Sequence, residues 1–267
     1  MMPTTSSFKL ERMPGVAKIV WDHPPLNLLG MDAIDELDSI LTGLEGDAEV
    51  RVILLVSALP KIFSAGVDIK AMAGLGTAEE VLRVVRKGTA LLRKLEASEK
   101  LTVAAIRGRC IGGGMELAMA FDLRIAARSA VFAQPEIRLG IIPGFGGTQR
   151  LPRLVGESAA RKWILTGDPV PAREFFRAGG VDYLESDWGF QKKAERFSER
   201  MSRASAMAIG AAKKALKAAR ERGGRPGEEI ESELFSGLTG TRDREEGLRA
   251  FIEKRTPRFN KTEKGLL

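Results

Sequence analysis

Two uninterrupted apolar runs, RVILLVSA at residues 51–58 and LTVAAIRG at residues 101–108, most constrain how this chain can fold. A half-exposed strand alternates apolar and polar residues, so runs without alternation are typical of strands covered on both faces. GVAKIVWD at residues 15–22 alternates and ends at a Pro-Pro turn, which predicts another strand. Because helices usually cover such buried strands, we expect an α/β protein.

Helical signals stand between these runs. The apolar spacing from Met31 to Leu44 predicts a helix with Asp32 as its N-cap. Thr77 and Glu80 have the spacing of a capping box, which predicts a helix that runs to about Ala97. Between these two helices, KIFSAGVDIK (61–70) is interpreted as an irregular loop.

The remaining chain changes character along its length. DLRIAA (122–127) and VFAQPEI (131–137) predict short strands, and GIIPGFGGTQ (140–149) predicts a glycine-rich loop. From about Glu157 the pattern is mainly helical, with one short strand near GVDYL (180–184). ARERGGRPGEE (219–229) is interpreted as a linker inside this helical end. We therefore expect an α/β core over residues 1–200 and a helical region over residues 201–267.

Several site classes are excluded by residue counts. The single cysteine, Cys110, excludes an intrachain disulfide and a cysteine-cluster metal site, and the single histidine, His23, excludes a multi-histidine metal site. We therefore predict no metal site. The N-terminal MMPTTSSFKLERMPG has no apolar h-region, and no segment approaches the roughly 18 apolar residues of a membrane span. We expect a cytoplasmic protein without a membrane partner.

The net charge of +7 favours an anionic partner, although from charge alone a solvated basic surface is the preferred interpretation. No glycine-rich segment fits G-x-G-x-x-G or the P-loop, which disfavours those modes of phosphate binding. AAKKALKAARERGGR (211–225) is strongly basic and suggests an RNA-binding alternative. We consider a nucleic-acid partner the weaker hypothesis, since no aromatic residues interleave to stack bases.

CIGGGMELAMA (110–120) carries the clearest chemical signal. Its glycines precede a predicted short helix from Met115, and free N–H groups at a helix start bind negative charge or a developing oxyanion. Glu116 lies in this otherwise apolar segment, and Glu136 follows Pro135 in a second apolar run. Two carboxyl groups in one pocket separate in proton affinity, so one serves as base and the other as acid.

The segment IRGRCIGGGMELAMAFDLRIAARSAVFAQPEIRLGIIPGFGGTQRLPRLVG resembles the signature region of the crotonase (enoyl-CoA hydratase/isomerase) family. KIFSAGVDIKAM is similar to that family's acyl-CoA loop, and TRDREEGLRAFIEKRTPRF resembles its C-terminal helix and tail. The likeness extends collinearly over about residues 14 to 261. It implies a spiral of ββα units followed by a helical trimerisation region, assembled as a homo-trimer or as a homo-hexamer made of two trimers.

The resemblance also implies a mechanism. The backbone N–H groups of Val67 and Gly113 would form an oxyanion hole for the thioester oxygen of a 2-enoyl-CoA. Family hydratases have carboxylates at the positions of both Glu116 and Glu136, which hold the water that adds to the double bond. We assign Glu116 as the water activator and Glu136 as the acid toward the α-carbon.

Further positions match the family's contacts with its acyl-CoA substrate, and coenzyme A is expected only as part of that substrate, with no permanently bound cofactor. Phe145 follows Gly144 where many members have a small residue, so we expect it to narrow the acyl pocket. Asp68 is interpreted as a loop cap and Cys110 as a buried filler. The predicted substrate-binding residues are Leu26, Lys61, Ala65, Ile69, Lys70, Gly112, Pro135, Gly144 and Phe251, the last acting on a neighbouring subunit.

Both carboxylates favour a hydratase producing a 3-hydroxyacyl-CoA, because isomerases and thioester hydrolases of the family often lack one. Within the same fold, a hydratase of a cyclic dienoyl-CoA and a Δ3,Δ2-enoyl-CoA isomerase remain alternatives. An RNA-binding homologue and a non-catalytic scaffold are alternatives of other classes.

Overall fold

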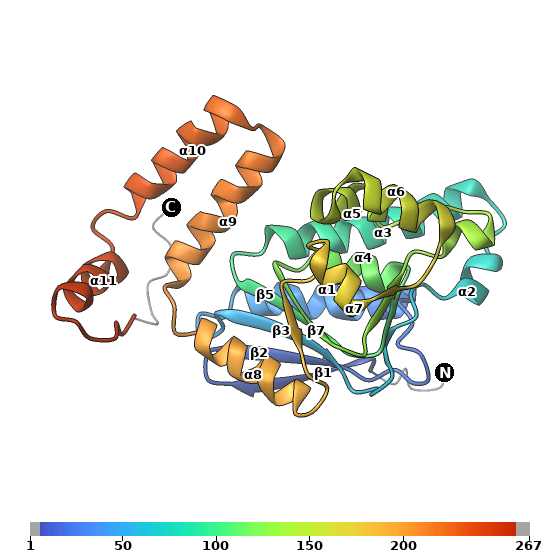
Figure 1. Ribbon diagram of the computed structural model, residues 1–267, viewed down its shortest axis with the longest axis horizontal. Coiled ribbons are helices and arrows are strands. Elements are labelled where there is room, and N and C mark those ends of the chain that lie inside the picture. Colours follow the sequence, from blue (N-terminus) through green and yellow to red (C-terminus); the bar gives the residue numbers. More distant parts are fainter. Residues whose placement is uncertain (1–5, 260–267) are drawn as a thin grey trace.

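The computed structural model describes residues 6–259 (Figure 1), and its strands form two sheets. Within these residues, the larger sheet has six strands in the order β1-β2-β3-β5-β7-β10, and the smaller has four in the order β4-β6-β8-β9. The strands are β1 (Phe8–Met13), β2 (Val16–Trp21), β3 (Val52–Ser57), β4 (Ile62–Ser64), β5 (Leu101–Ile106), β6 (Arg109–Ile111), β7 (Leu123–Ala127), β8 (Val131–Ala133), β9 (Val170–Pro171) and β10 (Tyr183–Glu185).

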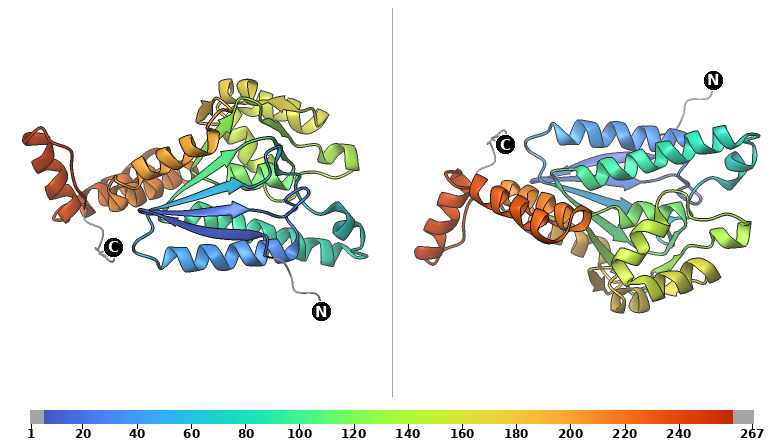
Figure 2. Two further views of the ribbon diagram at one scale, coloured as in Figure 1. Left: turned by 90° about the horizontal axis from the view of Figure 1, so that it is seen from below. Right: turned by 90° about the horizontal axis from the view of Figure 1, so that it is seen from above.

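Helices separate most of the strands in sequence and supply the outer layers of the molecule (Figure 2). They are α1 (Met31–Glu45), α2 (Ile69–Ala73), α3 (Ala78–Ala97), α4 (Gly113–Met119), the 3₁₀-helix η1 (Glu136–Leu139), α5 (Gly147–Val155), α6 (Glu157–Thr166), α7 (Ala172–Arg177), α8 (Phe190–Met201), α9 (Ala206–Glu221), α10 (Gly224–Gly237) and α11 (Arg242–Ile252). Among the described residues, no helix has the length and apolar character needed to cross a bilayer.

The two apolar runs form the central strands β3 and β5, which pair in parallel. Successive side chains of β3 enter different cores: Ile53 and Leu55 pack with the residues of α1 and α3, whereas Val52 and Leu54 pack with the α8 side. Both faces of the strand are therefore removed from water, which explains why its sequence does not alternate. The predicted buried strands and the α/β class are confirmed.

A strand of the large sheet is followed three times by a short strand of the small sheet and then by a helix: β3-β4-α2, β5-β6-α4 and β7-β8-η1. The three long strands are neighbours in one sheet and the three short strands are neighbours in the other. Each unit therefore stacks on the unit before it, and this is the predicted spiral of ββα units.

The C-terminal helices α9, α10 and α11 extend from one end of the sheet body (Figure 1). The predicted linker at 219–229 contains the turn between α9 and α10, where Gly223 has φ of 60°. Leu216, Phe235 and Phe251 on these helices are 71%, 77% and 83% exposed. The helical character of this end is confirmed, while trimer formation and the boundary at residue 200 stay predictions.

Several local predictions need correction. The helix at α1 begins at Met31 with Gly30 as its N-cap, so Asp32 lies in the first turn and is not the cap. The segment 61–70 is only partly a loop, because β4 and the start of α2 lie in it. Strand character in 131–137 ends at Ala133, since η1 begins at Glu136. The capping box of Thr77 and Glu80 is confirmed.

Asn27 ties the segment after β2 to β4, the strand that leads to Gly66 and Val67. Its side-chain amide donates to Ser57 Oγ at 2.8 Å and to Phe63 O at 3.0 Å, and its Oδ1 accepts from His23 N at 2.8 Å. Its backbone carbonyl accepts from Ser64 Oγ at 2.7 Å. Because Asn27 is fully buried, each of these bonds is protected from competition with water.

We expect Asn27→Ala to lower the free energy of unfolding by about 2–4 kcal/mol, because it leaves buried acceptors without donors. The backbone adds to the cost, since Asn27 has φ of 49°, which asparagine tolerates better than alanine. Urea unfolding measures the loss. Ser232→Ala, which removes an exposed side-chain bond on α10, is the control and should change stability by less than about 0.5 kcal/mol.

Candidate active site

The candidate active site lies where the three parallel strands of the small sheet end. β4 ends at Ser64, β6 at Ile111 and β8 at Ala133, and these strands are neighbours in that order. Within three residues of these strand ends come Gly66 and Val67, then Gly112 and Gly113, and then Glu136. The carboxyl ends of neighbouring parallel strands lie at one edge of a sheet, where ligand sites of α/β proteins commonly form.

Glycine allows the segments after β4 and β6 to approach each other closely. A Cβ at Gly66, which has φ of 93°, would lie 2.9 Å from Ile111 O and 3.1 Å from Gly113 N. A Cβ at Gly113 would lie 2.8 Å from Val67 Cγ2 and 3.4 Å from Val67 N. No side chain fits between these backbones, so the amide groups of Val67 and Gly113 lie side by side.

These two amides have the environment expected of an anion site. Gly113 is the first residue of α4, so its N–H has no acceptor in the helix. Among residues 6–259, neither this N–H nor that of Val67 donates a hydrogen bond to the protein. The helix predicted from Met115 begins two residues earlier, and this shift places Gly113 at the positive end of the helix dipole.

Glu116 is held by backbone groups of the glycine-rich loop. Its Oε1 accepts from Phe145 N at 2.8 Å and from Gly147 N at 2.6 Å. The side chain is almost fully buried in the first turn of α4. Two N–H donors on one oxygen fix the direction of the carboxyl group and favour its charged form.

Glu136 reaches the same place from the end of β8. A Cβ at Gly112 would lie 2.9 Å from Glu136 Oε1, so this glycine makes room for the carboxyl group. Glu136 Oε2 is buried and accepts no hydrogen bond within the described part of the chain. The neighbouring Gln134 donates from Nε2 to Gly112 O at 3.1 Å, and its Oε1 is likewise buried without a partner among those residues.

Burial shifts the titration of both carboxyl groups, and the charge of Glu136 also acts on Glu116. Burial raises the pKa of Glu116 to about 7, with the Glu136 charge adding to the rise, while the N–H groups of Gly147 and Phe145 and the charge of Arg150 oppose it. Burial also raises the pKa of Glu136. A carboxyl group that titrates near neutrality is suited to general acid–base chemistry.

Arg150 supports the loop that holds Glu116, and no pattern in the sequence pointed to this residue. Its guanidinium donates to Phe145 O at 2.6 Å and forms a two-pronged contact with Glu96 at 3.0 and 3.1 Å. The glycine-rich loop was visible in the sequence, but nothing there indicated that its N–H groups, with Gln134 and Arg150, would surround Glu116.

The predicted substrate-binding residues divide into two groups. Ala65 lies near the site, and its N–H donates to Leu26 O at 3.0 Å, which joins these two residues at the edge of the site. Gly112 and Pro135 flank the ends of β6 and β8. Gly144 is exposed in the loop before Phe145.

The other predicted residues do not contact the carboxyl pair. Lys61, Ile69 and Lys70 are exposed, with Lys61 before β4 and the others at the start of α2. Asp68 caps α2 by accepting from the N–H groups of Lys70 and Ala71, as expected. Phe251 lies on α11, far from the site within one chain (Figure 1).

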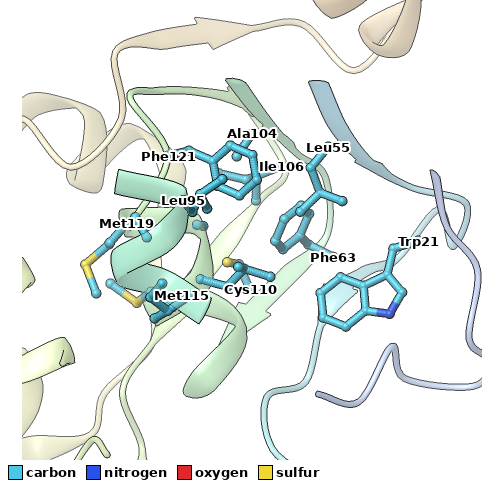
Figure 3. Packing of buried hydrophobic residues seen from close by; sticks show 14 of the residues in the cluster. Trp21, Leu55, Phe63, Leu95, Ala104, Ile106, Cys110, Met115, Met119 and Phe121 are labelled. Carbon is cyan, nitrogen blue, oxygen red and sulfur yellow. The ribbon is translucent and has the colours of Figure 1, made fainter. Parts of the chain in front are cut away.

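Cys110 is a packed core residue, as predicted. Its side chain is fully buried between Phe63 and Met115, close to the start of α4 (Figure 3). Its sulfur lies 3.5 Å from Gly114 O. The cysteine therefore supports the glycine turn from beneath.

Much of the basic charge of the proposed RNA helix is used within the fold. On α9, Lys213 pairs with Asp122 at 2.5 Å, Lys214 pairs with Glu99 at 2.9 Å, and Arg220 lies 3.6 Å from Glu96. These pairs reduce the free positive charge available for a phosphate backbone. They favour the interpretation of this helix as an ordinary charged surface.

Repeated ββα units, with their long strands neighbours in one sheet and their short strands neighbours in another, make up the crotonase class of fold. Residues 11–262 match the family described as enoyl-CoA hydratase/isomerase. The chain belongs to this family.

Named relatives cover nearly the whole chain. It is 37% identical to the short-chain-enoyl-CoA hydratase of Clostridium acetobutylicum, over 92% of this chain and 94% of the relative. It is 36% identical to the crotonyl-CoA hydratase of Syntrophomonas wolfei subsp. wolfei, over 94% and 96%. Among solved structures, the enoyl-CoA hydratase from Bacillus anthracis is similar with a TM-score of 0.91 and 36% identity, over 96% of this chain and 100% of that one.

The raised pKa of Glu116 predicts a pH-dependent stability. An unfolded glutamate titrates near 4.5 and the folded one near 7, so between these values folding requires uptake of a proton. The free energy of unfolding should therefore fall as pH rises through this window, by about 3 kcal/mol in total. Glu116→Gln should abolish most of this fall.

Urea unfolding at pH 5 and pH 8 measures this slope. Glu79→Gln, on the exposed surface of α3, is the control for loss of one formal charge and should keep the wild-type slope. A wild-type stability that rises from pH 5 to pH 8, or a slope unchanged in the Glu116 variant, would contradict the prediction.

Proposed function

We propose that this protein is an enoyl-CoA hydratase that adds water across the α,β double bond of a 2-enoyl-CoA thioester to give a 3-hydroxyacyl-CoA. The observation that carries the proposal is the convergence of the Val67 and Gly113 amides with Glu116 and Glu136 at the ends of β4, β6 and β8. The names of the relatives from Clostridium acetobutylicum and Syntrophomonas wolfei point to the same reaction.

The two backbone amides bind the thioester oxygen in this proposal. When water adds to the β-carbon, electrons move through the conjugated system and negative charge develops on that oxygen. Preorganised N–H donors stabilise this charge by several kcal/mol, since they need no reorganisation during the reaction. The dipole of α4 acts in the same direction.

The two carboxyl groups accept and donate the protons of the reaction. Water lies between Glu116 and Glu136, its oxygen bonds to the β-carbon, and its proton passes to one carboxylate while the other carboxylic acid protonates the α-carbon. We assign the base to Glu116, because two N–H donors stabilise its charged form. We assign the acid to Glu136, because its buried Oε2 has no donor among the described residues that would favour the charged form.

The surroundings of the site fit a CoA thioester. Leu26, Ala65 and Ile69 lie along the edge that leads to Val67, and Lys61 and Lys70 on the same segment supply positive charge for phosphate groups. Phe251 completes a neighbouring subunit's site in a trimer or hexamer, which accounts for its exposure in the single chain. The protein acts in the cytoplasm in this proposal.

We expect Glu116→Gln and Glu136→Gln each to lower the kcat for hydration by about a hundred- to ten-thousand-fold, the usual value of general acid–base catalysis. The loss of conjugated-thioester absorbance, followed with a panel of 2-enoyl-CoA substrates, measures the rate. Circular dichroism checks that each variant is folded, and Glu79→Gln is the matched control.

The same panel separates the alternatives within the family. A 3-enoyl-CoA substrate that gains conjugated absorbance faster than a 2-enoyl-CoA loses it would indicate a Δ3,Δ2-isomerase. Turnover restricted to a cyclic dienoyl-CoA would indicate the ring-specific hydratase. Near-normal hydration by either folded glutamine variant would remove that residue from the mechanism.

A further inference from the structure

The side chain of Phe145 is fixed in one position beside the candidate active site. Its N–H donates to Glu116, and its carbonyl accepts from Arg150 at 2.6 Å. These bonds hold the backbone on both sides of the Cα, and the side chain is only 2% exposed. The aromatic ring is therefore held rigidly in the packed core beside the candidate active site.

The ring packs against Gly88 on α3, where the absence of a side chain leaves room for it. A Cβ at Gly88 would lie 2.5, 2.5 and 2.7 Å from three carbons of the Phe145 ring, so any other residue at this position would collide with it. Glycine in the interior of a helix costs about 1 kcal/mol relative to alanine. Since Gly88 lies in the middle of α3, this cost is consistent with a packing role for the glycine.

Another part of the ring lies near Gly113. A Cβ at Gly113 would lie 3.7 Å from Phe145 Cδ2 and 2.8 Å from Val67 Cγ2. The ring thus fills the space between α3 and the amide of Gly113. An acyl chain that continues beyond the β-carbon must leave the space between the amides and the carboxyl groups, and on the α3 side the ring blocks its path.

We propose that Phe145, seated on Gly88, closes the acyl-binding space on its α3 side and selects short, straight 2-enoyl groups over longer ones. This inference rests on the proposed hydratase function. Phe145→Ala removes a ring that occupies the room of several methylene groups while keeping the backbone N–H that holds Glu116.

The test compares Phe145→Ala with the wild type in two measurements. Calorimetry gives the affinities for butanoyl-CoA and octanoyl-CoA, which cannot be hydrated, and kinetics gives kcat/KM for 2-butenoyl-CoA and 2-octenoyl-CoA. The ratio of long-chain to short-chain affinity, and the same ratio of kcat/KM, should rise about tenfold or more, since each methylene admitted contributes about 0.8 kcal/mol.

A residue swap tests whether the volume of the ring, on the α3 side, is what limits the acyl-binding space. In Phe145→Ala/Gly88→Leu, a side chain from α3 enters the volume that the ring vacated, because the Cβ of residue 88 points at the ring position. This double variant should return both ratios toward the wild-type values. Phe8→Ala, which removes a buried ring packed on Trp21 in β1, controls for general loss of core packing and should leave the ratios unchanged.

The outcomes separate this inference from the proposed function. Unchanged ratios in folded Phe145→Ala, or no recovery in the double variant, overturn the inference even if hydration is normal. Absence of hydration together with the expected shift in binding ratios overturns the proposed function, while the role of Phe145 in limiting the acyl-binding space stays supported. Failure to bind either acyl-CoA overturns both. If Phe145→Ala does not fold, Phe145→Leu should give a smaller shift of the same sign, and no shift overturns the inference.

Discussion

The close backbone approach at Gly66, Gly112 and Gly113 is the constraint on which the rest of the site depends. Side chains at these positions would separate the segments that follow β4, β6 and β8. With glycine there, the amides of two segments lie together and a carboxyl group from the third reaches them. The large sheet contributes by fixing the order of the short strands, since each short strand follows a long one whose neighbours are set by extensive pairing.

The acidic groups illustrate how one fold obtains two different carboxyl groups. Glu116 and Glu136 are both buried, but their donors differ: the first accepts two backbone N–H bonds, whereas the Oε2 of the second accepts none from the described residues. The two glutamates therefore place the same side chain in different environments, which is the condition under which proton affinities separate. Arg150 contributes indirectly, because it holds the loop carbonyl beside one of the two donors.

The sequence was most informative where local physics decides the structure. The buried runs at β3 and β5 and the capping box of α3 were predicted because burial and capping leave residue patterns. β9, which has only two residues, and the start of α4 at Gly113 were missed because short elements and helical glycines have no such pattern. The ββα repetition was not visible as a repeat, since each unit places different side chains on a similar backbone. Glu116 and Glu136 were visible as lone carboxylates in apolar runs, their convergence was expected only from family resemblance, and the donors to Glu116 came only from the three-dimensional structure.

In the loop around Phe145, the backbone and the side chain have separate roles. The N–H and carbonyl of this residue hold Glu116 and Arg150, while the ring alone contacts Gly88. Replacing the side chain leaves every one of those backbone bonds possible. In the role proposed for Phe145, a single codon change at this position would broaden or narrow the range of acyl groups during evolution, while the backbone bonds of the loop would stay in place.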